Sequence, residues 1–479
     1  METNWKPWHP RPADKIIRRP RAEQLHPVHI EVMPRRARPL ALNPPLILIY
    51  AFAALIGIGT TLLVLPFAHK GDGFTPFIDA LFTATSAATV TGLVTQDTPS
   101  YWTVPGQAVI MVLMFVGGLG IMTIVGSLFV LAGQRTGLTQ RMVLRETIGT
   151  SAFDNVTRIT VQIIIGAVVI QLVGFLVLLI RLVFLYTPGD AAWHALFQAV
   201  SGFNNGGFTS LPDSRNLSAF QTDIAIVGPI AVLVVMGSLS YWVMRDVVVR
   251  RRFPMFTLNT KLVLVFTGAL LLVGTAVFYL FEVGNDGSMG RLSSFDKLVV
   301  AVFHSVNRTA GFTTVDFGQT TDQTNLFYAV LMAIGGASAS VAGGIKVNTF
   351  AVFVIALLVS FRGQTSVSTF GRTIPDIQIR WAMVLVVLSF IGVALVTLTL
   401  TAVEREYPFL DLMFEAVSAF ATVGFSTGLT GDLSIVSKLV LTLAMFIGRV
   451  VPPMVIVVAL SQQQSSDLFR YPRENVVLG

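Results

Sequence analysis

The stretch SVNRTAGF, Ser305–Phe312, decides the architecture of this protein, because it places Asn, Arg and Thr around one Gly beside a long apolar run. Three further stretches share its pattern: SAATVTGL at Ser86–Leu93, SGFNNGGF at Ser201–Phe208 and SAFATVGF at Ser418–Phe425. In each of the four, a Ser precedes a Gly by six residues, and these glycines are Gly92, Gly207, Gly311 and Gly424. A single such glycine would ordinarily mark a turn, but four copies indicate an internal repeat.

The first and fourth copies agree further toward the N-terminus. The stretch PFIDALFTATSA begins at Pro76 and PFLDLMFEAVSA begins at Pro408, with the same offset of 332 that separates Gly92 from Gly424. Proline is favoured at the first position of a helix, so we expect Pro76 and Pro408 to occupy that position in two short helices.

The composition places most of the chain in lipid. Of its 479 residues, 53% are hydrophobic and 12% are charged. A bilayer core of ~30 Å needs about 20 apolar residues per helix, which predicts about eight spans. The corresponding runs are Leu46–Phe67, Val109–Ala132, Ile159–Leu185, Ile224–Val243, Leu262–Phe281, Leu326–Phe361, Ala382–Val403 and Leu439–Leu460. Stretches of about 12 residues such as Phe77–Ala88 are too short to cross, and we expect them to enter the membrane and return.

The basic residues predict the orientation. They follow the even-numbered spans, at Arg135, Arg141, Arg145, Arg245, Arg250, Arg251, Arg252, Arg362, Arg372 and Arg380. Acids flank the short stretches, at Asp72, Asp97, Asp190, Asp213, Asp286, Asp316 and Asp432. Since cytoplasmic loops carry the excess of Lys and Arg, the re-entrant stretches should face outside and both termini should be cytoplasmic, in a multi-pass protein of the cell membrane.

The remaining composition excludes several functions. Residues 1–42 carry nine Lys or Arg against four acids, a net of 9 − 4 = +5, which favours contact with anionic membrane lipid over nucleic acid. The chain has no cysteine, and its six histidines have no HxxxH spacing, which argues against a zinc site. We find no acid pair, nucleophile triad or P-loop, so we predict no enzyme and no nucleotide site on this chain.

Four re-entrant loops around one axis would form a pore. Non-helical backbone at membrane depth must be buried in protein or line water, and glycine with positive φ can turn carbonyl oxygens toward a permeating cation. The short helices would aim their negative C-terminal ends at the same axis. The predicted potassium filter consists of Thr89, Val90, Thr91, Gly92, Asn204, Asn205, Gly206, Gly207, Arg308, Thr309, Ala310, Gly311, Ala421, Thr422, Val423 and Gly424. We expect the Arg308 side chain to point away from the axis, in a packing or acid-paired role.

Small residues follow each loop. At Gly117–Gly120 and Gly237–Ser240 we interpret them as close helix contacts. The stretch GGASASVAGGIK, Gly335–Lys346, is too flexible for an unbroken helix, and we interpret it as a gate. Arg449 lies inside an apolar run, where an unpaired charge costs ~2.5–3.5 kcal/mol, so we expect it to meet this loop and form a barrier to cations. The predicted gate residues are Gly335, Gly336, Ser338, Ser340, Gly343, Gly344, Lys346 and Arg449.

The predicted fold is an all-α polytopic membrane protein. Four repeats of span, re-entrant pore helix with filter loop, and span are arranged with pseudo-fourfold symmetry around one pore. The predicted parts are a basic cytoplasmic arm at 1–42, repeats at 43–133, 134–252, 253–362 (with the broken second span) and 363–461, and a cytoplasmic tail at 462–479.

The filter stretches together with GGASASVAGGIK and MFIGR resemble the Trk/Ktr/HKT superfamily of potassium-translocating subunits, most closely its Ktr branch, over roughly Leu46–Leu460. The resemblance implies potassium uptake through a homodimer, gating by the intramembrane loop, Na⁺ as a candidate activator, and regulation by a cytoplasmic nucleotide-binding ring. Gly92, where other members have Ser, implies selectivity for K⁺ over Na⁺. Two alternatives stay open. One is a Na⁺- or H⁺-coupled cation symporter on the same architecture, and the other is an intramembrane hydrolase, which the lack of a base and nucleophile disfavours.

Overall fold

The computed structural model describes residues 44–133, 152–212, 216–364 and 366–462. The arm at 1–42, Arg135, Arg141, Arg145, Asp213 and nearly all of the tail lie outside these ranges. All described residues belong to one compact unit, Pro44–Gly479. Within it the chain is almost entirely helical, with one small antiparallel hairpin, β1 (Ser368–Thr369) and β2 (Arg372–Thr373).

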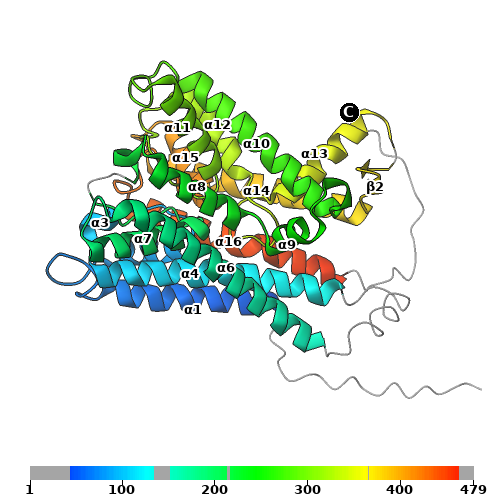
Figure 1. The fold of residues 1–479 in the computed structure, drawn as a ribbon, viewed down its shortest axis with the longest axis horizontal. Helices are drawn as coiled ribbons and strands as arrows, with labels where there is room; N and C mark the ends of the chain where they lie inside the picture. The colour runs from blue at the N-terminus through cyan, green and yellow to red at the C-terminus, as the bar shows by residue number, and fades with distance from the viewer. Residues whose placement is uncertain (1–43, 134–151, 213–215, 365, 463–479) are drawn as a thin grey trace, which may run out of the picture. The chain divides into compact units, whose positions relative to one another are not determined.

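The helices fall into four groups in chain order (Figure 1). Group 1 is α1 (Pro44–Val64), α2 (Phe77–Ala88), α3 (Thr98–Tyr101) and α4 (Val104–Gly133). Group 2 is α6 (Ala152–Leu182), α7 (Pro188–Phe203), the 3-10 turn η2 (Ser218–Phe220), α8 (Ile224–Ser238), α9 (Tyr241–Arg250) and η3 (Phe253–Met255). Group 3 is α10 (Leu258–Glu282), α11 (Ser294–Asn307), α12 (Asp322–Ala333) and α13 (Val347–Phe361). Group 4 is α14 (Asp376–Val403), α15 (Phe409–Phe420) and α16 (Ile435–Gln462).

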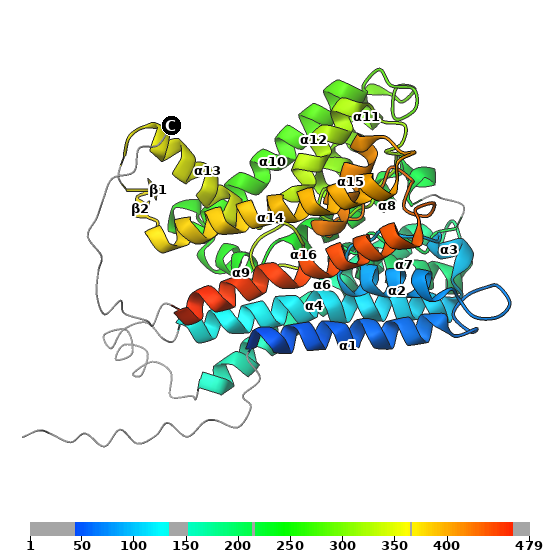
Figure 2. The same cartoon turned by 180° about the vertical axis from the view of Figure 1, so that it is seen from behind.

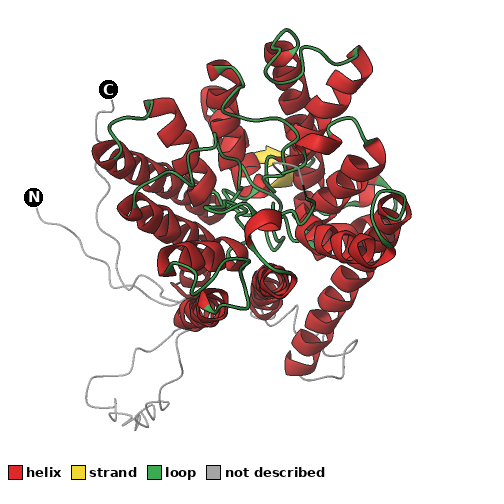
Figure 3. Cartoon of the chain, turned by 90° about the vertical axis from the view of Figure 1, so that its left-hand side faces the viewer, coloured by secondary structure: helices red, strands yellow, loops and turns green. Residues whose placement is uncertain are grey.

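The groups contact one another in chain order and close into a ring. Group 1 contacts group 2 through α4 with α6 and α7, and group 2 contacts group 3 through α8 with α11. Group 3 contacts group 4 through α12 with α15 and α13 with α14. The ring closes through α16, which packs on α1 and α2. Figure 2 shows α16 beside α2. Viewed from the side in Figure 3, loops gather between the helices of this ring.

Several helices are long and apolar enough to cross a membrane. Among the described residues, four pass this test by length and composition, and the bent pair α8–α9 would make a fifth. The four are Arg158–Leu182, Leu258–Glu282, Asp376–Val403 and Ile435–Pro453. Shorter apolar segments coincide with further predicted spans, at Leu48–Val64, Val104–Gly120 and Val347–Phe361. The chain is therefore a membrane protein by its helices as well as by its composition.

The short helices α2, α7, α11 and α15 each carry an Asp in the first turn. A carboxylate there stabilises the positive end of the helix dipole. In α7 the N-cap Thr187 accepts from the Asp190 amide, and in α11 Ser293 accepts from that of Asp296. The prediction that Pro76 and Pro408 take the first helical position is wrong by one residue. Both are N-cap residues with ψ of 129° and 143°, extended values that end the preceding loop.

The predicted span Ile224–Val243 is not one helix. It breaks after Ser238, and α8 and α9 meet at 96°. Leu239 and Ser240 take extended backbone angles, and the Ser240 hydroxyl accepts a hydrogen bond from the Val243 amide, which begins α9. A serine that caps a new helix favours such a break over continuation. The last carbonyls of α8 are consequently free to bind other segments.

Candidate functional site

Four loops follow the short helices, and each contains one of the four glycines of the repeated pattern. Their φ angles are +90° at Gly92, +70° at Gly207, +67° at Gly311 and +103° at Gly424. This left-handed region is accessible at low cost only to glycine. All four sites therefore require the residue that the sequence places there.

The four glycines lie side by side in chain order, and each faces a carbonyl oxygen of the next loop. A Cβ on Gly92 would lie 2.6 Å from the Gly206 oxygen and 3.0 Å from the Gly207 Cα. The glycines and the residues whose carbonyl oxygens they face are, around the ring, Gly92 with Gly206, Gly207 with Ala310, Gly311 with Val423, and Gly424 with Thr91. The oxygen in every pair belongs to the residue just before a glycine of the pattern. The structure thus joins four segments about 100 residues apart into one closed ring of main-chain groups.

Three of the four loops have the same internal geometry. Val90, Asn205 and Thr422 take positive φ of 57°, 57° and 49° two residues before their glycines. The amide just before each of these glycines donates to the carbonyl of the repeated Ser, at 2.7 to 2.9 Å. The third loop differs, because the amides of Ala310 and Gly311 both donate to the Asn307 carbonyl, at 2.9 and 3.0 Å.

The repeated serines hold these loops. The hydroxyls of Ser86 and Ser418 each accept from the amide of the glycine six residues later, at 3.1 Å. Ser201 donates to the Phe208 carbonyl at 2.7 Å, and Ser305 donates to the Leu271 carbonyl of α10 at 2.7 Å. The first and fourth copies, which agree most closely in sequence, therefore share the bond from the glycine amide to the serine hydroxyl.

A glycine on the helix after the loop packs on the C-terminal carbonyl of the short helix in three groups. A Cβ on Gly117 would strike the Ala88 oxygen, one on Gly237 the Phe203 oxygen, and one on Gly448 the Phe420 oxygen. Each of these carbonyls lies four residues before a ring glycine. The close approach of helices through small residues is the role that we expected for Gly117 and Gly237.

Replacing Gly117 by alanine is expected to lower the free energy of unfolding of the detergent-solubilised protein by about 1–3 kcal/mol, because the new methyl group would overlap the Ala88 carbonyl. Gly120→Ala is the matched control in the same helix, since a Cβ there has no neighbour within 4 Å. Alanine normally favours a helix by about 0.5–1 kcal/mol over glycine, so the control should be neutral or stabilising. Equal unfolding temperatures for the two variants would contradict the packing role.

The predicted gate segment lies between α12 and α13 and is not helical. The amides of Ala337 and Val341 donate to the carbonyls of Ser238 and Gly237, at 2.9 and 3.2 Å. The base of the loop is closed where the Gly335 amide donates to the Ile345 carbonyl at 2.8 Å. A Cβ on Gly343 would strike the Ala421 carbonyl, so the loop also touches the fourth predicted filter segment, Ala421–Gly424. We call residues 334–346 the crossing loop from here on.

Three basic side chains donate to carbonyls of the crossing loop. Arg449 is 3% exposed, and its Nη1 lies 2.7 Å from the Val341 oxygen. Lys346 binds the Ala342 carbonyl through Nζ. Arg308 turns from the third predicted filter segment, Arg308–Gly311, toward the end of α12 and binds the Ile334 carbonyl through Nη1. None of the four ion pairs among the described residues includes Arg308, so its partner is a main-chain carbonyl and not an acid.

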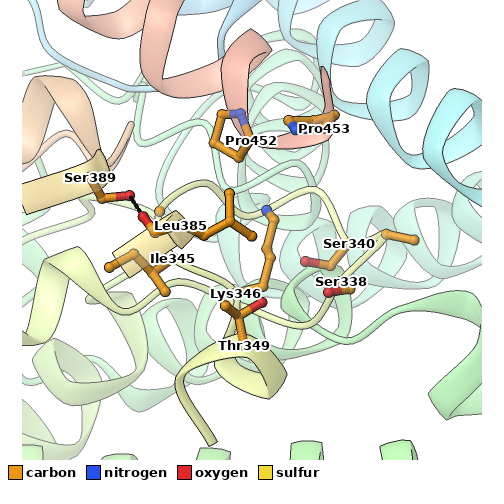
Figure 4. Close-up of a pocket in the computed structure, with 11 residues that line it drawn as sticks. Ser338, Ser340, Ile345, Lys346, Thr349, Leu385, Ser389, Pro452 and Pro453 are labelled. Carbon is orange, nitrogen blue, oxygen red and sulfur yellow. Dashed lines mark hydrogen bonds between the residues drawn. The ribbon is translucent and has the colours of Figure 1, made fainter. Parts of the chain in front are cut away.

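A small cavity of about 30 Å³ lies beside the crossing loop (Figure 4). The loop forms one wall, and α13, α14 and α16 contribute Thr349, Leu385 and the pair Pro452 and Pro453. The Lys346 side chain extends toward the two prolines (Figure 4). The loop therefore has a small cavity on one side and the predicted filter segments on the other.

Sequence analysis missed polar residues that hold the far ends of the loops. Gln198 donates to Thr209, and buried Glu415 accepts from Ser426 at 2.5 Å. His304 Nε2 accepts from the Thr314 amide at 3.2 Å. The signal was available, since Gln198 and Glu415 both lie nine residues before a ring glycine in otherwise apolar helices. Within the described ranges no cluster of three or more His, Cys, Asp or Glu could hold a metal ion.

Comparison with known proteins places the chain in a family. The sequence profile named TrkH, cation transport protein, matches residues 33–471. Ktr system potassium uptake protein B of Bacillus subtilis is 38% identical over 440 residues, covering 91% of this chain and 97% of that protein. Potassium/sodium uptake protein NtpJ of Enterococcus hirae is 36% identical over 453 residues, covering 94% and 100%.

A solved structure agrees with this assignment. The potassium transporter TrkH from Vibrio parahaemolyticus superposes with a TM-score of 0.67 at 17% identity, over 89% of this chain and 86% of that one, which shows a common fold. The chain therefore belongs to the TrkH family of cation transport proteins, as the resemblance of its glycine stretches, GGASASVAGGIK and MFIGR predicted, and not to a family of enzymes.

Proposed function

We propose that this protein takes up potassium ions across the cell membrane through a channel-like pore on the axis of the glycine ring. The observation that carries the proposal is the closed ring of four loops. In this ring, each glycine faces the carbonyl oxygen of the residue that precedes the glycine of the next loop. Main-chain oxygens in a ring can replace the hydration shell of a monovalent cation. Relatives of the chain are named potassium uptake proteins, which favours K⁺ as the ion.

The four helix groups would act as pseudo-symmetric repeats around this pore, with boundaries as the sequence predicts. The short helices end at the ring, so their negative C-terminal dipoles would favour a cation there. With both termini cytoplasmic, the membrane potential would drive uptake with ~2.3 kcal/mol per charge per 100 mV. We propose a homodimer, with a cytoplasmic nucleotide-binding ring as regulator.

The crossing loop would be the gate. It bonds to the end of α8, touches the fourth filter segment and receives Arg449, so it lies directly beside the ring. Two buried or half-buried cations, Arg449 and Lys346, would add an electrostatic barrier to a permeating K⁺.

Ion flux into liposomes tests this function. We expect the purified chain to carry K⁺ faster than Na⁺ and to exclude large organic cations, and we expect a chain lacking residues 337–342 to carry K⁺ faster still. If neither chain carries K⁺ although both are folded by size-exclusion chromatography, or if large cations pass equally well, the proposal is wrong.

A Na⁺-coupled symporter is the second candidate, because one relative is named a potassium/sodium uptake protein. The same liposomes separate the two candidates. Potassium flux that is unchanged when Na⁺ is left out excludes obligatory coupling, whereas flux that requires Na⁺ on the side of uptake favours coupling or activation by Na⁺.

A further inference from the structure

The break between α8 and α9 places Ser238 between the filter segments and the crossing loop. Its hydroxyl and its carbonyl oxygen bind different partners. Ser238 is the last residue of α8, and a helix that continued past it would have used its carbonyl internally. Ser238 therefore contacts both the proposed filter and the proposed gate.

The hydroxyl joins two filter segments. Asn205 Nδ2 donates to Ser238 Oγ at 2.7 Å and to Thr309 Oγ1 at 3.0 Å, and the two hydroxyl oxygens are 3.0 Å apart. Asn205 and Thr309 are 1% and 3% exposed, so no water replaces these bonds easily. Both residues lie two positions before a ring glycine. The triangle fixes the second filter segment against the third.

The main chain around Ser238 holds the crossing loop. The Ser238 carbonyl accepts from the Ala337 amide at 2.9 Å, and the neighbouring Gly237 carbonyl accepts from the Val341 amide at 3.2 Å. Gly237 also packs on the second filter segment, because a Cβ there would lie 3.0 Å from Asn205 Oδ1. Any motion of the crossing loop that breaks these bonds therefore acts on the residue that positions Asn205 and Thr309.

The position is distinctive within the repeats. The residue that follows the packing glycine is Gly118 in group 1 and Arg449 in group 4, and neither has a hydroxyl. Gly118 leaves room for the Asn204 side chain, whereas Arg449 reaches the crossing loop. In group 2, serine is small enough to fit beside the filter and still hydrogen-bonds to it.

We propose that Ser238 is a positioning residue for ion selectivity and that it couples the crossing loop to the second and third filter segments. This inference rests on the proposed filter and gate. It states that K⁺ selectivity depends on the Ser238 hydroxyl and changes with the state of the loop.

Selectivity of Ser238→Ala tests the first part. In liposomes, the ratio of K⁺ to Na⁺ flux should fall by about tenfold, as expected when the buried Asn205 and Thr309 side chains lose one hydrogen-bond partner. Ser238→Thr keeps the hydroxyl and should keep the ratio. Ser240→Ala is the matched control, since this hydroxyl lies two residues away and caps α9. It should lower stability and leave the ratio unchanged.

A double-variant experiment tests the coupling. Deleting residues 337–342 removes both main-chain bonds to the end of α8, and it should lower the K⁺ to Na⁺ ratio by about threefold while raising total flux. Ser238→Ala should then have a smaller effect in the shortened chain than in the full one, because the two changes act through one network. An unchanged ratio after the deletion, with an undiminished effect of Ser238→Ala, would refute the coupling.

The failures can be told apart. If Gly207→Ser leaves the K⁺ to Na⁺ ratio unchanged, the filter proposal itself is wrong. If Gly207→Ser abolishes selectivity but Ser238→Ala does not alter it, only the present inference is wrong. Should Ser238→Ala not accumulate as folded protein, Thr309→Val removes the opposite hydroxyl of the triangle and must lower the ratio in the same way.

Discussion

Gly311→Ser is expected to abolish the preference for K⁺, with the K⁺ to Na⁺ flux ratio falling by at least about tenfold. The substitution acts in two ways. A side chain at φ of +67° is strained by about 1–3 kcal/mol. Its Cβ would also fall against the Val423 carbonyl and lie 2.7 Å from the Gly424 Cα, which forces the third and fourth filter segments apart. Growth of a strain without other potassium uptake should fail at low external K⁺.

Gly428→Ser is the control that separates the effect of backbone strain from the effect of displacing a ring carbonyl. Gly428 has φ of +96° and is exposed, and a Cβ there has no neighbour within 4 Å. This control carries the same kind of backbone strain close to the ring but displaces no carbonyl. We expect normal selectivity from it. If Gly311→Ser retains full selectivity in folded protein, the ring is not the filter.

Deleting residues 337–342 is expected to raise K⁺ flux in the absence of any regulatory subunit by about 10- to 100-fold. The deleted residues Ala337 and Val341 form three hydrogen bonds with α8 and α16, two to the carbonyls of Ser238 and Gly237 and one from Arg449. At ~1 kcal/mol each, they favour the seated loop by ~3 kcal/mol, so the displaced loop would be about 1% populated. Stopped-flow measurement of K⁺ entry into liposomes gives the increase directly.

Arg449→Met tests the same gate with one side chain. It removes the donor to Val341 and the positive charge while keeping an unbranched chain, so flux should rise in the same direction but less than after the deletion. Lys438→Met is the control in the same helix, because Lys438 pairs with Asp79 at 3.5 Å on the short helix α2. A fall in flux for the deletion and for Arg449→Met, with folding preserved, would contradict a gate.

The sequence was informative wherever the decisive property is local. A run of apolar residues predicts a membrane helix by its length alone, and a glycine that recurs six residues after a serine in four stretches predicts a left-handed turn. The sequence also predicted the break in the helix at Gly335–Lys346, because a segment so rich in glycine and serine does not propagate a helix in lipid. The family followed from the order of these local features.

Other features depended on contacts that local rules do not contain. The break after Ser238 lies in a run that is apolar enough to continue, and it is stabilised by partners at Ala337 and Val341, about 100 residues later in the chain. The third loop departs from the other three, although its Ser and Gly have the same spacing.

The sequence by itself determined that four glycine turns recur in a membrane protein and which residues form them. Only the tertiary structure decided that each turn faces the next one's carbonyl oxygen, and that Ser238 lies between two of them and the crossing loop. The physical reason is that backbone conformation is set by residues next to one another, whereas a ring of main-chain groups is set by helix packing across hundreds of residues.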